Sequence, residues 1–110
     1  MATAADLRDV ALALEGTTSA PHFDRTAFKV ARIYATLAAD GLSANLKFTP
    51  EEQEQHCERH PDAFTPVDNA WGRQGWTTVW LEEIRPRDLN AALLVAWKHA
   101  QPKPKKRSAR

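Results

Sequence analysis

Three neighbouring side chains near the middle of the sequence could bind a metal ion or attack a substrate: His56, Cys57 and His60. The two histidines are four residues apart, so on a helix they would share one face, as metal-binding histidines do. Cys57 would lie about 100° away around the same helix. Because metal sites use three or four protein ligands, we interpret the histidines as a solvated helix face and predict no metal. No catalytic signature surrounds Cys57, so we interpret it as a small apolar side chain of the interior.

Two pairs of adjacent carboxylates, Glu51-Glu52 and Glu82-Glu83, are the other candidates for acid–base chemistry. Adjacent residues point in different directions on a helix or a strand, so neither pair forms a coupled dyad by itself. Gly72 and Gly75 lie close together, but no strand–glycine loop–helix unit surrounds them, which argues against a phosphate-binding loop. We therefore predict a protein that is not an enzyme and that has no cofactor.

The basic and aromatic side chains indicate binding rather than catalysis. Several of them fall in or beside predicted strands, where they could meet the phosphates and bases of a nucleic acid. Trp71 lies in a predicted turn and is either exposed or packed over the core; the large area of an indole favours the second. The candidate nucleic-acid-binding residues are Lys29, Arg32, Tyr34, Asn45, Lys47, Trp71, Arg73, Lys103, Lys105, Lys106 and Arg107.

The formal net charge of +1 conceals an asymmetry along the chain. Residues 101–110 hold five basic side chains and no acid, whereas residues 1–100 hold ten basic and 14 acidic side chains, a net of −4. We predict one domain at 1–100 and a disordered basic tail at 101–110. Five phosphate contacts from this tail would give weak binding that falls steeply with salt, although a tail that only keeps the protein soluble has the same composition. The acidic domain itself counts against strong DNA binding.

Length and composition are those of an ordinary globular protein. The 110 residues, 43% of them hydrophobic, suffice for one domain. The one cysteine excludes an intrachain disulfide and a thiolate cluster. The N-terminal residues lack the basic and apolar regions of a signal peptide, and no window has the apolar length of a membrane span, so we expect a cytoplasmic protein.

Periodicity predicts the elements that position these residues. Apolar residues at helical spacing indicate a first helix at 3–15 and a third that starts near Pro86. Thr49-Pro50-Glu51-Glu52 has the pattern of a capping box and predicts a second helix, which ends near residue 60. Alternation predicts strands at 26–30, 33–37, 42–48, 63–67 and 76–81, with a loop at 17–24 and turns at 40–41 and 71–75.

This order, α-β-β-β-α-β-β-α, predicts an α+β fold. The fold is expected to be a two-layer sandwich in which the first and third helices pack on one face of an antiparallel sheet. The other sheet face would be open to water or to a partner. The side chains expected there are Lys29, Tyr34, Thr36, Asn45 and Lys47.

Several segments, taken together, resemble a known family. The segments are Pro21-His22-Phe23, Ala27-Phe28-Lys29-Val30, Arg32-Ile33-Tyr34-Ala35-Thr36-Leu37, Asn45-Leu46-Lys47-Phe48, Pro50-Glu51-Glu52-Gln53, Pro66, Trp71-Gly72-Arg73 and Gly75-Trp76-Thr77-Thr78-Val79. Over residues 5–100 their order and spacing are similar to those of the MmcQ/YjbR family, which is described as DNA-binding. Ala31 and Arg32 stand where the family usually has glycine and lysine, so the charge at that turn is kept.

The resemblance implies a two-layer α+β sandwich similar to secretion chaperones, to frataxin-like proteins and to the double-wing DNA-binding domain of a phage transcription factor. It also implies DNA as the partner. Together with the charged side chains, the resemblance leads us to expect mainly phosphate contacts, from the open sheet face and from the basic tail, which is not part of the family pattern. The likeness to secretion chaperones leaves a second hypothesis open, a protein-binding or chaperone-like module. In either case we expect a monomer or a weak homodimer.

Overall fold

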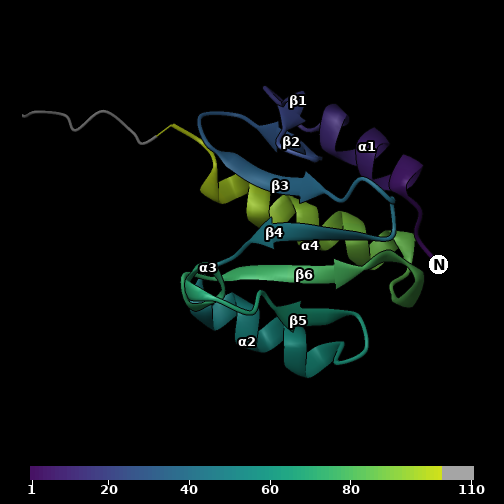
Figure 1. Ribbon diagram of the computed structural model, residues 1–110, viewed down its shortest axis with the longest axis vertical. Coiled ribbons are helices and arrows are strands. Elements are labelled where there is room, and N and C mark those ends of the chain that lie inside the picture. The colour runs from purple at the N-terminus through teal and green to yellow at the C-terminus, as the bar shows by residue number, and fades with distance from the viewer. Residues whose placement is uncertain (103–110) are drawn as a thin grey trace, which may run out of the picture.

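The computed structural model describes residues 1–102, so the candidate residues Lys103, Lys105, Lys106 and Arg107 lie outside the described part of the chain. Six strands form one antiparallel sheet in the order β1-β2-β3-β4-β6-β5 (Figure 1), which confirms the predicted α+β class. The elements are α1 (Ala4–Ala13), β1 (Thr18–His22), β2 (Arg25–Lys29), β3 (Ile33–Leu37), β4 (Ser43–Lys47), α2 (Pro50–Arg59), β5 (Phe64–Pro66), α3 (Ala70–Arg73), β6 (Trp76–Trp80), the 3-10 turn η1 (Leu81–Glu83) and α4 (Pro86–His99).

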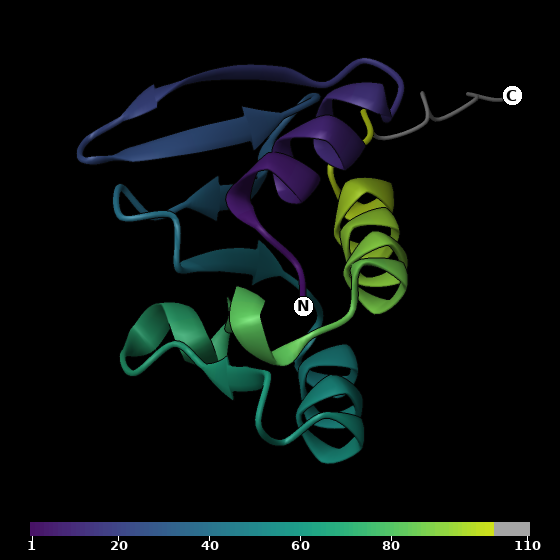
Figure 2. The ribbon, with the colours of Figure 1, turned by 90° about the vertical axis from the view of Figure 1, so that its right-hand side faces the viewer.

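Helices cover one side of the sheet and leave much of the other side open. In Figure 1, α4 passes behind β3 and β4, and Figure 2 shows α1, α2 and α4 on the same side. α4 contacts β3, β4 and α1, and α2 contacts β5. The core between these layers is built from fully buried side chains that include Phe28, Leu37, Leu46, Val79, Leu89 and Leu93. Within residues 1–102, no helix is long and apolar enough to cross a membrane.

Capping residues set where the helices begin. The Thr49 hydroxyl accepts a hydrogen bond from the Glu52 backbone N–H at 3.1 Å, and the Glu52 carboxylate accepts one from the Thr49 N–H at 2.9 Å. This is the predicted capping box of α2, with Pro50 in its first turn. Thr3 and Asp6 form a second capping box, so α1 begins at Ala4; it ends at Ala13, before the extended residue Leu14.

The predicted loop at 17–24 is wrong, because most of it is strand β1. This strand pairs with β2 from Thr18 opposite Lys29 to His22 opposite Arg25. Its side chains are mostly exposed, so it has no apolar alternation that could reveal it. An edge strand pairs on one side only and tolerates a proline such as Pro21. The predicted turn at 71–75 is corrected as well, because residues 70–73 form the short helix α3.

Tyr34 is not on the open face, where we expected it to meet a ligand. Phe28 pairs with Ala35 but Lys29 pairs with Ile33, so Tyr34 is an extra residue in a β-bulge. The bulge turns the Tyr34 side chain toward the helices, where it is fully buried. Its hydroxyl lies 2.9 Å from the Thr17 hydroxyl and 3.4 Å from the Ala11 carbonyl oxygen. Tyr34 is therefore a core residue.

This placement predicts how the protein behaves at alkaline pH. Burial raises the pKa of Tyr34 above its ordinary value of 10.0, although the hydrogen bond with Thr17 partly opposes this. The stability that the neutral phenol contributes should be complete below pH 10.0 and lost as the pH rises through the higher folded-state pKa. Because the chain has one tyrosine, tyrosinate absorbance reports this group alone. We expect its midpoint above 10.0, together with a loss of circular dichroism; ionisation at or below 10.0 with the fold intact would contradict the placement.

Candidate functional site

A groove of about 580 Å³ lies on the open face of the sheet. In Figure 2 the β1–β2 hairpin and the segment around α3 both project on the side away from the helices. Residues of both segments line the groove. β3, β4 and β6 supply its floor. We call it the open-face groove; it is lined by His22, Phe23, Asp24, Arg25, Ile33, Thr36, Asn45, Val67, Asn69, Trp71 and Trp76.

Arg25 is the positively charged group of this groove that sequence reasoning missed. Its Nε donates a hydrogen bond to the Thr36 hydroxyl at 2.9 Å, and its Nη2 donates to the Thr36 carbonyl at 3.1 Å. These bonds hold the guanidinium against the strand next to its own, and Nη1 has no hydrogen-bond partner within residues 1–102. We predicted that this strand begins at residue 26, but β2 begins at Arg25. With that start, alternation places Arg25 on the same strand face as Ala27 and Lys29, so the sequence pattern could have revealed it.

Two tryptophans form the wall of the groove on the β6 side. Trp71, in α3, is 59% exposed, so our preferred interpretation that it packs over the core is wrong. Trp76 is half-buried and lies opposite Lys47 on β4. The register places Trp76, Thr78 and Trp80 on the open face, as their alternation predicts. The Thr78 hydroxyl donates to the Asn45 carboxamide at 2.8 Å, which fixes the orientation of this candidate residue on the groove floor.

Phe23 forms the opposite rim, in an unfavourable conformation. It lies in the turn between β1 and β2 with a φ of 60°, a left-handed value that bulky residues rarely adopt. Its side chain is 93% exposed, so packing within the domain does not explain the conformation. Backbone strain of this kind costs about 1–3 kcal/mol and concentrates at functional sites. The residue is present in the sequence motif at 21–23, but its conformation is visible only in the structure.

A second hollow, of about 390 Å³, lies where β3 begins and β4 ends, and we call it the end hollow. It contains two predicted binding residues, Arg32 and Lys47. The Arg32 Nη1 donates to the His99 carbonyl oxygen at 2.7 Å, and the Lys47 Nζ donates to the carbonyl oxygens of Phe48 and Gln74 at 3.2 and 2.8 Å. Burial lowers the pKa of Lys47, and the Glu52 carboxylate opposes that shift. The other two predicted cations of the domain, Lys29 and Arg73, are exposed.

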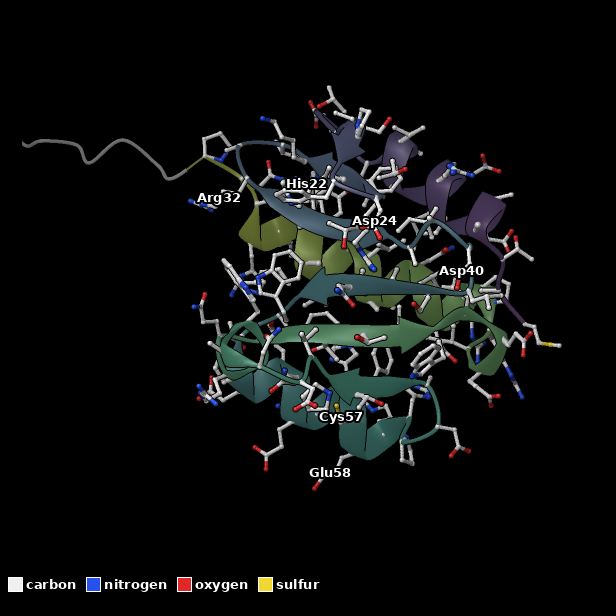
Figure 3. All side chains as sticks on the ribbon, in the orientation of Figure 1. His22, Asp24, Arg32, Asp40, Cys57 and Glu58 are labelled. Carbon is white, nitrogen blue, oxygen red and sulfur yellow. The ribbon has the colours of Figure 1, made fainter. Side chains whose placement is uncertain are left out.

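A hollow at the far end of the sheet is lined by carboxylates. Its volume is about 420 Å³, and its lining residues are Leu42, Asp62, Trp80, Glu82 and Glu83. Figure 3 shows Arg32 and Asp40 at opposite ends of the strands. A polyanion would therefore be attracted to the Arg32 end and repelled from the Glu82 end.

The two histidines first considered as metal ligands pack against aromatic side chains. The His56 ring stacks on Phe48 with centroids 4.3 Å apart, and its Nδ1 lies 2.8 Å from the Glu52 carbonyl oxygen. His60 packs against Phe64. Cys57 is half-buried, and burial raises the pKa of its thiol. Within residues 1–102, no three His, Cys, Asp or Glu side chains are grouped closely enough to hold a metal ion.

Comparison with known proteins identifies the family. The family model for YjbR matches residues 12–99. The chain belongs to the YjbR family. Two solved structures resemble the YjbR domain: a Deinococcus radiodurans protein with a DUF419 domain, and a Pseudomonas syringae protein. A search of curated proteins gave no match.

The first of these structures shares 28% sequence identity with the YjbR domain at a TM-score of 0.73, over 87% of this chain and 76% of the other. The second shares 15% identity at a TM-score of 0.65, over 84% of this chain and 94% of the other, which shows the fold alone. Both structures therefore share the α+β fold of this chain.

Proposed function

We propose that this YjbR domain is a non-enzymatic DNA-binding protein that holds a single strand in the open-face groove. The observation that carries the proposal is that the exposed Trp71 and the half-buried Trp76 share one groove with the Arg25 guanidinium. Aromatic side chains stack on bases of any sequence, at about 1–3 kcal/mol per base. Arg25 and Asn45 would supply hydrogen bonds to phosphate or base edges at the groove floor.

The charges near the groove support the same ligand. Within residues 1–102, the only ion pair joins His99 and Glu52, so no carboxylate pairs with Arg25, Arg32 or Arg73. These arginines are available to phosphates, and the five basic side chains of residues 101–110 would add to the attraction. The predicted cytoplasmic location, the absence of enzyme activity and the monomeric or weakly dimeric state stay predictions.

Fluorescence anisotropy with a labelled oligothymidylate and with a duplex of equal length tests the proposal. We expect the single strand to bind more tightly than the duplex at low salt. If the three arginines contact phosphates, they alone should contribute about −2 to the slope of the logarithm of the affinity against the logarithm of the salt concentration. The full chain should have a steeper slope, and deleting residues 101–110 should weaken binding and flatten the slope toward that value. If neither oligonucleotide binds at micromolar protein, the proposal is wrong.

The main alternative is a protein-binding or chaperone-like module that uses the same groove. The apolar part of the lining, with Phe23, Ile33, Val67, Trp71 and Trp76, would suit an extended peptide as well. A protein partner that binds with the nucleic acid digested away, and that Trp71→Ala releases, would support this alternative. Within residues 1–102 no carboxylate pairs with Arg25, Arg32 or Arg73, and this favours the DNA hypothesis.

Phe23 should show the trade-off between stability and binding that functional strain produces. Asparagine tolerates a left-handed φ better than phenylalanine does, so Phe23→Asn should raise the free energy of unfolding by about 1 kcal/mol. The same change removes an aromatic group from the rim and should weaken oligothymidylate binding. Phe23→Leu is the matched control, because it keeps the backbone cost but loses the ring. If Phe23→Asn binds as tightly as the wild type, Phe23 has no part in the site.

A further inference from the structure

The open-face groove and the end hollow are adjacent parts of one surface. They share three lining residues, Ile33, Trp71 and Trp76. The shared tryptophans therefore lie between two regions: the open-face groove, which contains Arg25 and Asp24, and the end hollow, which contains Arg32 and Lys47. A ligand with an aromatic part and an anionic part could occupy both.

Arg32 and Lys47, the cationic groups of the end hollow, are held by hydrogen bonds to the backbone and retain further N–H donors. One of the five guanidinium N–H groups of Arg32 is used by the His99 carbonyl oxygen. Two of the three ammonium protons of Lys47 are used by the carbonyl oxygens of Phe48 and Gln74. Since backbone atoms already fix both side chains, binding an anion there would cost little additional side-chain entropy.

The charge balance of the end hollow favours an anion. Glu52 is the carboxylate next to these groups, and it is already shared between the Thr49 N–H at 2.9 Å and the His99 Nε2 at 2.7 Å. Arg32 and Lys47 together carry more positive charge than this one carboxylate offsets. Burial lowers the pKa of Lys47 because it removes water from the ammonium group. An anion bound beside Lys47 would stabilise the charged ammonium in place of that water.

We propose that the end hollow is a phosphate subsite, which binds a phosphate of the same strand whose base stacks at Trp71 and Trp76. This inference rests on the proposed DNA-binding function and makes it more specific. The unit that the protein recognises is then a nucleotide, with its base in the open-face groove and its phosphate at Arg32 and Lys47. A nucleoside alone would use only half of the site.

Substitutions of two arginines, one beside the last residue of α4 and one at its start, test this subsite. Arg32→Gln removes one of the two cations of the end hollow. Arg85→Gln is the matched control, because it removes an exposed arginine at the start of α4, about 20 Å along the helix from His99. A hydrogen bond to a charged group is worth about 1.5–3 kcal/mol, so Arg32→Gln should weaken oligothymidylate binding by at least about tenfold. The control should change it by less than about twofold, as long-range attraction alone would.

An oligothymidylate with uncharged methylphosphonate linkages separates the phosphate from the bases. The proposal expects Arg32→Gln to leave the binding of the methylphosphonate strand unchanged. Lys47→Met, which retains the length of the side chain, should likewise weaken the binding of ordinary oligothymidylate and leave that of the methylphosphonate strand unchanged. Thermal unfolding of each variant checks that the fold is retained. Two outcomes would overturn the subsite but not the proposed function. One is an equal loss of oligothymidylate affinity for Arg32→Gln and Arg85→Gln; the other is that Arg32→Gln weakens the ordinary and the methylphosphonate strand equally. If the wild type binds neither oligonucleotide, the proposed function fails and the subsite fails with it.

Competition distinguishes a nucleotide site from a site for any phosphate ion. Deoxythymidine 5′-monophosphate should displace labelled oligothymidylate at concentrations where inorganic phosphate and deoxythymidine, each added alone, displace none. Equal displacement by the nucleotide and by inorganic phosphate would show that the bases contribute nothing at this site, and would overturn the proposal.

Discussion

Replacing Trp71 with alanine is expected to weaken the binding of oligothymidylate by about 5- to 150-fold, the loss that follows from one stacked base. The indole is 59% exposed and lies on the wall shared by the open-face groove and the end hollow. Because so much of the side chain is in contact with water, its removal should leave the free energy of unfolding within about 1 kcal/mol of the wild-type value. Anisotropy titrations and denaturant unfolding of the same preparation measure both effects.

Trp80 provides the matched control for this prediction. It is 44% exposed and lies on the same sheet face, but beside Glu82 and Glu83 at the acidic end. Trp80→Ala should therefore leave DNA binding unchanged. Equal losses for the two variants would mean that the tryptophans contribute a general hydrophobic attraction and that the groove is not the site.

The largest effect on stability is expected for Gly75→Ala. Gly75 has a φ of +109°, and a Cβ added there would lie 1.9 Å from the backbone oxygen of Phe48. The segments that follow β4 and precede β6 would have to move apart. We therefore expect the free energy of unfolding to fall by about 3 kcal/mol or more, and Tm to fall by more than about 10 °C. The change would also disturb the groove, because the Phe48 N–H donates to the Gly75 carbonyl at 3.2 Å and Trp76 follows directly.

Gly41→Ala separates the steric clash from the cost of a positive φ. Gly41 also has a positive φ, +73°, but a Cβ there would meet only the Ala4 side chain at 3.4 Å, an ordinary contact. Its replacement should cost about 1 kcal/mol. Similar melting temperatures for the two variants would show that the close approach of residues 48 and 75 is not what limits stability.

Local sequence signals were sufficient for most of the fold. The capping box at Thr49 and Glu52, the Asp40-Gly41 turn and the alternation around Leu46 depend on neighbours in sequence, so they could be read without knowledge of the tertiary structure. The features that were missed depend on partners elsewhere in the chain. Strand β1 has no buried side to show alternation, and the bulge at Tyr34 exists only in the pairing of β3 with β2.

The candidate site was predictable only in part, for the same reason. Asn45 and Trp71 line the open-face groove, and Arg32 and Lys47 line the end hollow. The sequence could not show that the β1–β2 turn rises over the sheet and brings Phe23 and Arg25 to the same groove. Nor could composition show that the mildly acidic domain separates its charges into a cationic end and an acidic end of one sheet.

The four tryptophan indole N–H signals in an NMR titration with oligothymidylate test the central claim most directly, because each signal reports one location. Trp71 and Trp76 line the open-face groove, Trp80 lies at the acidic end, and the Trp97 indole donates to the Glu15 carbonyl oxygen at 2.9 Å. We predict that the Trp71 and Trp76 signals shift on titration while those of Trp80 and Trp97 stay unchanged. Shifts confined to Trp80 or Trp97, or no shift of any indole signal at saturating DNA, would contradict binding in the open-face groove.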